Sequence, residues 1–317
     1  MVQTRTMALA DVARTDRTYV DAFGVEITYY VWAAPSPRGV VQLAHGVGEY
    51  ALRYTELAEN LVRAGYTVYA DDHRGHGATG IAQWGEGSGR LGHLGPGGLR
   101  ATQDALRQLT GIIRSEHDET PVVLLGHSWG SLMAQNIANE HASSYDGLVL
   151  TGTAYRTPGS MNGGDLNKRH AHLGTTGFEW LSRDPAVAQA MSVDPLAVEA
   201  SVLKLFGLRD SLRLYGRPGR DLARDLPVLI MVGDDDPLGG AKSAERLAHA
   251  YLNRSHLTDV ELIVYDGARH EVFNETNRAE VTQDLIAWLD DRFAVGTDPA
   301  ADPAAGPAAE DPSAPAE

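Results

Sequence analysis

The most informative stretch of this chain is Val122-Val123-Leu124-Leu125-Gly126-His127-Ser128-Trp129-Gly130. An apolar run at residues 122–125 leads into a G-x-S-x-G turn, and a run with helical spacing follows at residues 131–141. A serine on a sharp turn between a strand and a helix stands above the edge of a sheet, where it can act as a nucleophile. Glycine is required on both sides, because a larger residue there would clash with the strand and the helix. The sequence therefore predicts that Ser128 is a catalytic nucleophile.

Short apolar runs alternate with amphipathic stretches along the rest of the chain. Expected strands are residues 26–32, 40–44, 67–70, 122–125, 148–151, 228–232 and 261–265, and expected helices are residues 54–64, 99–116, 131–141, 242–252 and 278–293. Strands that alternate with helices form mostly parallel sheets with right-handed crossovers. We therefore predict an α/β fold in which helices flank a mostly parallel central sheet.

One interval, between residues 151 and 228, is too long for an ordinary crossover and is predicted to be a cap over the active site. Its apolar face, to which Phe206 and Leu208 belong, either attaches the cap to the core or lines an acyl pocket, and these two residues are candidate substrate contacts. From residue 296 the chain consists almost entirely of Ala, Pro, Gly and acids, which predicts disorder. The expected divisions are an N-terminal extension (1–18), a first core part (19–152), the cap insertion (153–225), a second core part (226–295) and a tail (296–317).

Composition narrows the range of partners. The net charge is −15 and no basic patch is evident, which disfavours nucleic acid and limits membrane contact to a transient one. The chain has no cysteine, and neither a signal peptide nor a membrane-spanning stretch is evident, so we expect a cytoplasmic protein. No nucleotide-binding motif is recognised, and Asp71-Asp72-His73-Arg74-Gly75-His76-Gly77 fits a hydrogen-bonded turn better than a metal site. We therefore expect neither a cofactor nor a metal, while the oligomeric state stays open.

The acid that orients the catalytic base should follow a later strand, since the partners of such a serine come in the order Ser, Asp or Glu, then His. Three aspartates, Asp234, Asp235 and Asp236, follow the strand at 228–232. Asp236 is preferred, because the turn must run a few residues before it reaches the base and Pro237 fixes the backbone beyond it. Asp234 and Asp235 are expected to cap or solvate the turn.

The base should follow the last core strand, and His270 lies five residues beyond residue 265. His249 lies within an expected helix and His256 precedes the strand, so both fit less well. His170 and His172, in the expected cap, are predicted to be surface residues. Ester cleavage also needs donors for the oxyanion, and the backbone N–H groups of Val47 and Trp129 are the candidates.

Taken together, these motifs resemble those of the monoacylglycerol lipase and lysophospholipase branch of the serine α/β-hydrolases, a serine aminopeptidase S33-type domain. The resemblance spans residues 19–293. It implies Ser128, Asp236 and His270 as the triad, Val47 and Trp129 as the oxyanion hole, and a cap over a glycerol or lipid ester. Trp129 and Ser131 stand where many members carry Met and Gly, which implies a narrower pocket mouth. The resemblance is carried by 45-HGVGEY-50, 72-DHRGHG-77, 126-GHSWGS-131, 182-SRDP-185, 194-DPL-196, 233-GDDDP-237 and 265-YDGARHEVFNE-275.

The expected function is a cofactor-independent serine esterase that acts on a small-molecule or lipid ester, with a monoacylglycerol or lysophospholipid as the favoured substrate. Two alternatives use the same triad. One is a general short-chain carboxylesterase. The other is an aminopeptidase or amidase, which needs a cap group to hold the substrate amine, and Glu179, Asp184 and Glu199 are the candidates.

Overall fold

The computed structural model describes residues 12–293, so the expected tail (296–317) and most of the expected N-terminal extension lie outside the described residues. An eight-stranded sheet has the order β1-β2-β4-β3-β5-β6-β7-β8. Pairs β1–β2 and β2–β4 are antiparallel, and all other pairs are parallel. The predicted fold class is confirmed. The strands are β1 (Arg14–Val20), β2 (Glu26–Trp32), β3 (Gly39–Ala44), β4 (Tyr66–Asp71), β5 (Val122–His127), β6 (Gly147–Thr151), β7 (Val228–Gly233) and β8 (Val260–Tyr265).

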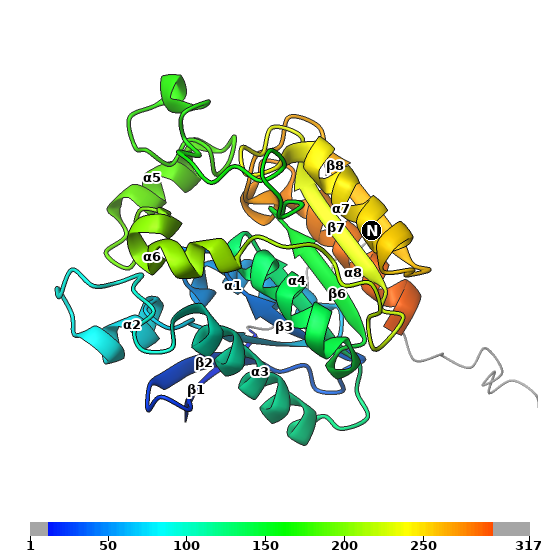
Figure 1. The fold of residues 1–317 in the computed structure, drawn as a ribbon. Coiled ribbons are helices and arrows are strands. Elements are labelled where there is room, and N and C mark those ends of the chain that lie inside the picture. The colour runs from blue at the N-terminus through cyan, green and yellow to red at the C-terminus, as the bar shows by residue number, and fades with distance from the viewer. Residues whose placement is uncertain (1–11, 294–317) are drawn as a thin grey trace, which may run out of the picture.

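Helices cover both faces of the sheet (Figure 1). On one face α3 (Gly98–Glu116), α4 (Trp129–His141) and α7 (Gly240–Arg254) contribute to one apolar cluster with the strands. On the other face α1 (Thr55–Arg63) and α8 (Arg278–Phe293) contribute to a second cluster. Strands β3 to β7 are buried along their whole length, which explains why they read as continuous apolar runs in the sequence.

Two elements of the core were not predicted. Strand β1 begins at Arg14, inside the segment expected to be an extension, and pairs with β2 from Arg14 opposite Trp32 to Val20 opposite Glu26. Tyr19 is its one buried residue, so this edge strand lacks the apolar pattern that marks the others. The second element, α2 (Gly77–Trp84), begins in a glycine-containing turn that gives no helical signal.

The segment between β6 and β7 forms a cap with two helices, α5 (Pro185–Val193) and α6 (Val202–Arg213). It lies at the end of the sheet toward which the arrows of β6 and β7 point (Figure 1). Asp184 caps α5 by accepting a hydrogen bond from Ala186 N at 3.0 Å. Gly207 interrupts α6 with a φ of +76°. Within residues 12–293, no helix combines the length and the apolar character needed to cross a bilayer.

Candidate active site

Ser128 occupies a strained backbone position between β5 and α4, with φ 52° and ψ −123°. Its N–H donates to Thr151 O, at the end of β6, at 2.9 Å, and its carbonyl accepts from Leu132 N of α4 at 3.1 Å, so β6 and α4 hold the turn. A Cβ on Gly126 would lie 2.6 Å from Gly130 O, and a Cβ on Gly130 would lie 2.1 Å from Ala44 O. The clash predicted from the sequence is therefore present on both sides of the serine.

Asp236 and His270 meet at the carboxyl end of the sheet. Asp236 follows β7 and His270 follows β8, and His270 Nδ1 lies 2.9 Å from Asp236 Oδ1. Leu238 N donates to the same oxygen at 2.9 Å and so fixes the carboxylate. With Nδ1 donating to Asp236, Nε2 is the basic nitrogen of the ring, and it has no hydrogen-bond partner within residues 12–293.

The surroundings of His270 favour a charged imidazolium. Burial of the ring lowers the pKa of His270. The negative charges of Asp236, Glu271 and Glu49 raise this pKa by more than burial lowers it. The net result is a pKa above the ordinary value for histidine. His270 and Ser128 line the same cavity, so the imidazole and the hydroxyl belong to one site.

The three adjacent aspartates separate into different environments. Asp234 is exposed, and Asp236 is buried against His270. Asp235 binds two cap residues, Arg169 at 2.5 Å and His170 Nε2 at 2.9 Å. The expectation that Asp235 only caps or solvates its turn is therefore incomplete, since it also joins the cap to the core.

The two cap histidines differ in exposure. His172 is exposed as predicted, whereas the prediction that His170 is a surface residue is wrong. The carboxylate of Asp235 gives the buried His170 ring a polar partner. The sequence did not show this partner because it lies 65 positions away.

The candidate oxyanion donors flank the nucleophile from two loops. Val47 and Ser128 line the same cavity, and Gly46 approaches the serine closely, since a Cβ on Gly46 would lie 3.0 Å from Ser128 Cβ. Trp129 is the first residue of α4, where a backbone N–H has no acceptor in its own helix. Both N–H groups therefore come from positions suited to an oxyanion that forms above Ser128.

A buried ion network, not predicted from the sequence, links these loops. Arg53 Nη1 binds Glu49 Oε2 at 2.8 Å and Glu271 Oε1 at 2.6 Å. Glu49 also accepts from Gly46 N at 2.5 Å, which ties the network to the loop that contains Val47. Burial raises the pKa of Glu49, whereas the charge of Arg53 overcomes the effect of burial and holds the pKa of Glu271 at about 2. The spacing of Glu49 and Arg53, four residues apart, was the available signal.

Hydrogen-bonded polar side chains form the histidine-rich turn after β4, which is the arrangement favoured from the sequence. Asp72 accepts hydrogen bonds from Ala51 N at 2.9 Å, Ala78 N at 2.7 Å and Tyr30 OH at 3.0 Å. His73 Nδ1 lies 2.9 Å from Asp71 Oδ2. No group of three His, Asp or Glu residues suited to hold a metal occurs in the described part of the chain.

The cap closes over Ser128. The cavity beside the serine measures about 10 Å³, room for no more than about one water molecule. The ring of Trp180 lies 4.7 Å from that of His270, so the cap covers this histidine directly. The cap residues that line this cavity are Phe178, Trp180, Leu181, Met191 and Ala200.

The two candidate substrate contacts on α6 lie outside this cavity. Phe206 packs against Trp129, with 4.8 Å between ring centroids, and Leu208 is 66% exposed. The side chain of Trp129 also turns away from the cavity, toward Phe206, His73 and His76. In this closed state cap residues, and not Trp129, therefore narrow the space beside Ser128.

The three acids considered as amine ligands are already engaged. Both Glu179 oxygens accept hydrogen bonds from Asn167, Thr176 and Gly177. Asp184 caps α5, and Glu199 forms a surface pair with Lys204 at 3.1 Å.

Comparison with known proteins places this geometry in a family. A protein-family model described as serine aminopeptidase, S33, matches residues 35–277 of this chain. The chain is similar to a monoacylglycerol lipase from Mycolicibacterium smegmatis, with 32% identity over 87% of this chain and 97% of that protein. It is 28% identical to a monoglyceride lipase from Rattus norvegicus, over 82% of this chain and 85% of the relative. A solved carboxyl esterase from Bacillus coagulans, in complex with glycerol, has a TM-score of 0.75 and 25% identity, over 89% of this chain and all of that one.

Proposed function

The chain belongs to the serine aminopeptidase S33 family, and from this premise we propose that it hydrolyses monoacylglycerols and related lipid esters through an acyl intermediate on Ser128. It is a serine ester hydrolase of the α/β-hydrolase fold. The observation that supports the assignment of residues is the buried contact of 2.9 Å between Asp236 and His270, beside the cavity that Ser128 lines.

In the proposed reaction one residue, His270, transfers every proton. Ser128 Oγ attacks the ester carbonyl while His270 Nε2 takes the hydroxyl proton, and Asp236 stabilises the imidazolium. The N–H groups of Val47 and Trp129 hold the oxyanion of the tetrahedral intermediate. His270 then gives its proton to the leaving alcohol, and a water molecule activated by His270 releases the fatty acid.

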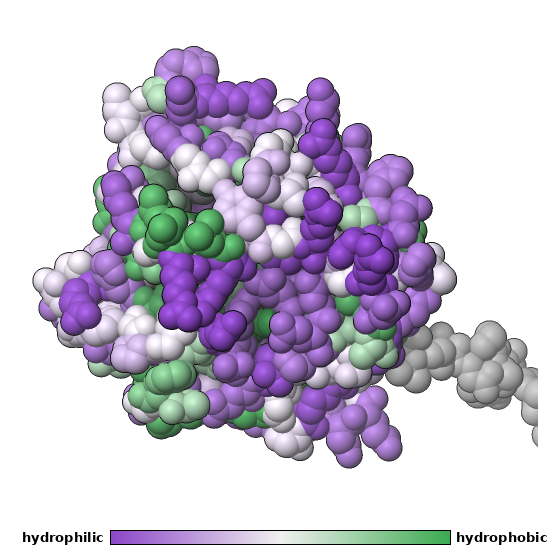
Figure 2. Space-filling model, viewed as in Figure 1, coloured by the Kyte–Doolittle hydropathy of each residue, from purple (hydrophilic) through white to green (hydrophobic). Residues whose placement is uncertain are grey.

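Substrate entry requires the cap to move. A cavity of about 10 Å³ cannot hold an acyl chain, and the residues that close it come from the cap. The outer side of α6 exposes three leucines, which form an apolar patch over this helix in Figure 2. We propose that this patch makes transient contact with a lipid surface, where monoacylglycerol is concentrated. The three residues are Leu203, Leu208 and Leu212.

An ester is favoured over an aminoacyl amide because the acidic cap side chains are committed elsewhere. Glu179 binds the loop at 174–177, Asp184 caps a helix, and Glu199 pairs with Lys204 at the surface. An amidase would need one of these carboxylates to hold the substrate ammonium group.

The test is hydrolysis by wild type and Ser128→Ala across monoacylglycerols, lysophosphatidylcholine, short aryl esters and an aminoacyl anilide. We expect monoacylglycerol turnover to dominate and Ser128→Ala to lower kcat by about 10⁶. Activity confined to short esters would reduce the proposal to a general carboxylesterase. Preferential cleavage of the anilide, or wild-type turnover by Ser128→Ala, would contradict it.

A further inference from the structure

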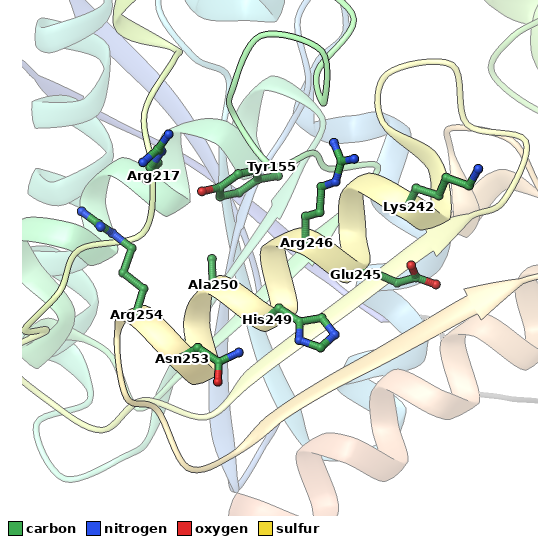
Figure 3. A pocket seen from close by; sticks show the side chains of 9 residues that line it. All are labelled: Tyr155, Arg217, Lys242, Glu245, Arg246, His249, Ala250, Asn253 and Arg254. Atoms are coloured by element: carbon green, nitrogen blue, oxygen red, sulfur yellow. The ribbon is translucent and has the colours of Figure 1, made fainter.

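A second pocket lies on α7, away from the catalytic serine. Its volume is about 680 Å³, within the range of small-molecule sites. None of the residues that line it also lines the Ser128 cavity. The lining residues, shown in Figure 3, are Tyr155, Arg217, Lys242, Glu245, Arg246, His249, Ala250, Asn253 and Arg254.

The pocket is positively charged although the chain carries a net charge of −15. Four cationic side chains and one carboxylate line it, which gives a formal charge of +3. Within residues 12–293, no carboxylate lies within 4.0 Å of any of these four cations. Elsewhere the arginines commonly have such a partner: Arg114 and Arg224 share Asp146, and Arg292 binds Asp259. The pocket therefore keeps a net positive formal charge, because its one carboxylate, Glu245, pairs with none of the four cations.

Neutral groups hold two of the arginines in place. Arg254 Nε donates to Pro218 O at 2.7 Å, and Arg246 Nη1 donates to Ser160 Oγ at 2.8 Å. Each contact uses one N–H direction and leaves the rest of the guanidinium group available to a ligand. In Figure 3 the hydroxyl of Tyr155 points toward the space between Arg217 and Arg254, which adds a further donor.

One buried arginine lies next to a lining residue of the pocket in the sequence. Arg156 follows the lining residue Tyr155 and is 1% exposed. It donates to two neutral acceptors, Gln135 Oε1 at 2.9 Å and Leu214 O at 2.9 Å, while its Nη2 has no partner in the described part of the chain. Burial lowers the pKa of Arg156 to about 10, which leaves it charged at neutral pH. A buried cation without a carboxylate is costly, and an anion bound nearby would offset part of that cost.

We propose that the α7 pocket binds a phosphoryl group carried by a small organic ester or by a lipid headgroup. A phosphoryl group offers several anionic oxygens at once, and arginines bind it through pairs of parallel N–H donors. The pocket is larger than one phosphate ion needs, so the ligand includes an organic portion that extends over Tyr155 and α7.

The test measures binding to the full-length protein in two arms. Isothermal titration with pyrophosphate and with glycerol 3-phosphate detects a soluble ligand, and flotation with phosphatidylcholine vesicles, with or without phosphatidylglycerol, detects a headgroup. The test variant is Arg217→Gln/Arg246→Gln, which removes two exposed charges from the pocket. The control variant, Arg100→Gln/Arg107→Gln, removes two exposed charges from α3.

We expect saturable binding by wild type in at least one arm, at least tenfold weaker in the pocket variant and unchanged in the control. Raised ionic strength should also weaken it. The arm that shows this pattern identifies the source of the phosphoryl group. No saturable binding in either arm, or equal loss in both variants, would overturn the proposal. Ester hydrolysis should be the same in both variants, so this outcome is independent of the function proposed for Ser128.

Discussion

The core and the cap differ in how their apolar residues are buried. The residues proposed for catalysis are held by the core: β5 and β7 are buried along their whole length, and the turns after them contain Ser128 and Asp236. The cap instead exposes large apolar side chains, with Leu203 59%, Leu208 66% and Leu212 58% exposed. A rigid core suits the fixed distances that proton transfer requires, and a cap that can move suits the admission of a long chain. The difference indicates that the core determines the chemistry and the cap determines access.

Apolar contacts and many hydrogen bonds join the two regions, and three of the polar contacts involve residues near the proposed site in the sequence. Arg183 of the cap binds Glu275, five residues beyond His270, with Nε to Oε2 at 2.8 Å. Asp235, next to Asp236, binds His170 of the cap at 2.9 Å. Val198 N donates to Gly48 O at 3.0 Å, which joins the cap to the loop that contains Val47. Substitutions at these contacts should change how readily the substrate enters the site without changing the rate of the chemical step.

The largest difference between the regions should appear at the adjacent aspartates. Asp236→Asn should lower kcat by about 10⁴, because the amide leaves His270 in the wrong tautomer and without a counter-charge. Asp235→Asn should change kcat by less than about tenfold, because it weakens only the contact with the cap. Steady-state kinetics on a soluble monoacylglycerol measures both. Equal losses of kcat in the two variants would show that the contact with the cap affects the rate as much as the contact with His270 does.

The pH dependence should reflect the core alone. Catalysis needs neutral His270, and its pKa lies above the ordinary 6.5, so kcat/KM should fall as the pH drops through a value above 6.5. The residual activity of Asp236→Asn should show this fall at lower pH, because the charge that raises the pKa is gone. A variant in the cap, Glu199→Gln, should leave the profile unchanged. An acid limb that moves with Glu199→Gln would contradict this assignment.

The contact between Arg183 and Glu275 should matter more for stability than other cap ion pairs. Glu275 is fully buried and accepts from the backbone N–H groups of Arg183 and Arg269 as well. Glu275→Gln should therefore reduce the free energy of unfolding by about 3 kcal/mol. Glu199→Gln, in an exposed pair, should cost less than about 1 kcal/mol. Urea denaturation compares the two, and similar losses would show that the buried contact has no special role.

The smallest effects are expected on α6. Leu208→Ser should weaken binding to lipid vesicles and leave hydrolysis of a soluble short ester unchanged, because Leu208 is exposed and lies outside the cavity. Phe206→Ala should lower thermal stability, because it removes the contact with Trp129. Vesicle flotation and thermal melts measure the two effects. A loss of soluble-ester turnover in Leu208→Ser would place this residue in the substrate path.

Local patterns predicted the buried strands of the core and most of its helices. The buried strands appear as apolar runs, and the candidate residues follow them in chain order. The length of the turn after β7 and the position of Pro237 favoured Asp236 over Asp234 and Asp235. Strand β1 was not predicted, because an exposed edge strand needs no apolar pattern. The burial of His170 and the network of Glu49, Arg53 and Glu271 depend on contacts between residues far apart in sequence. No local pattern encodes those contacts.

The central claim is that an acyl intermediate forms on Ser128 in the core. Its most direct test is labelling with a fluorophosphonate followed by mass spectrometry of the intact protein and its peptides. We predict one adduct, located on the peptide that contains Ser128, and no adduct in a Ser128→Ala variant that melts at the wild-type temperature. An active enzyme that takes no label, or that takes it at another residue, would contradict the account.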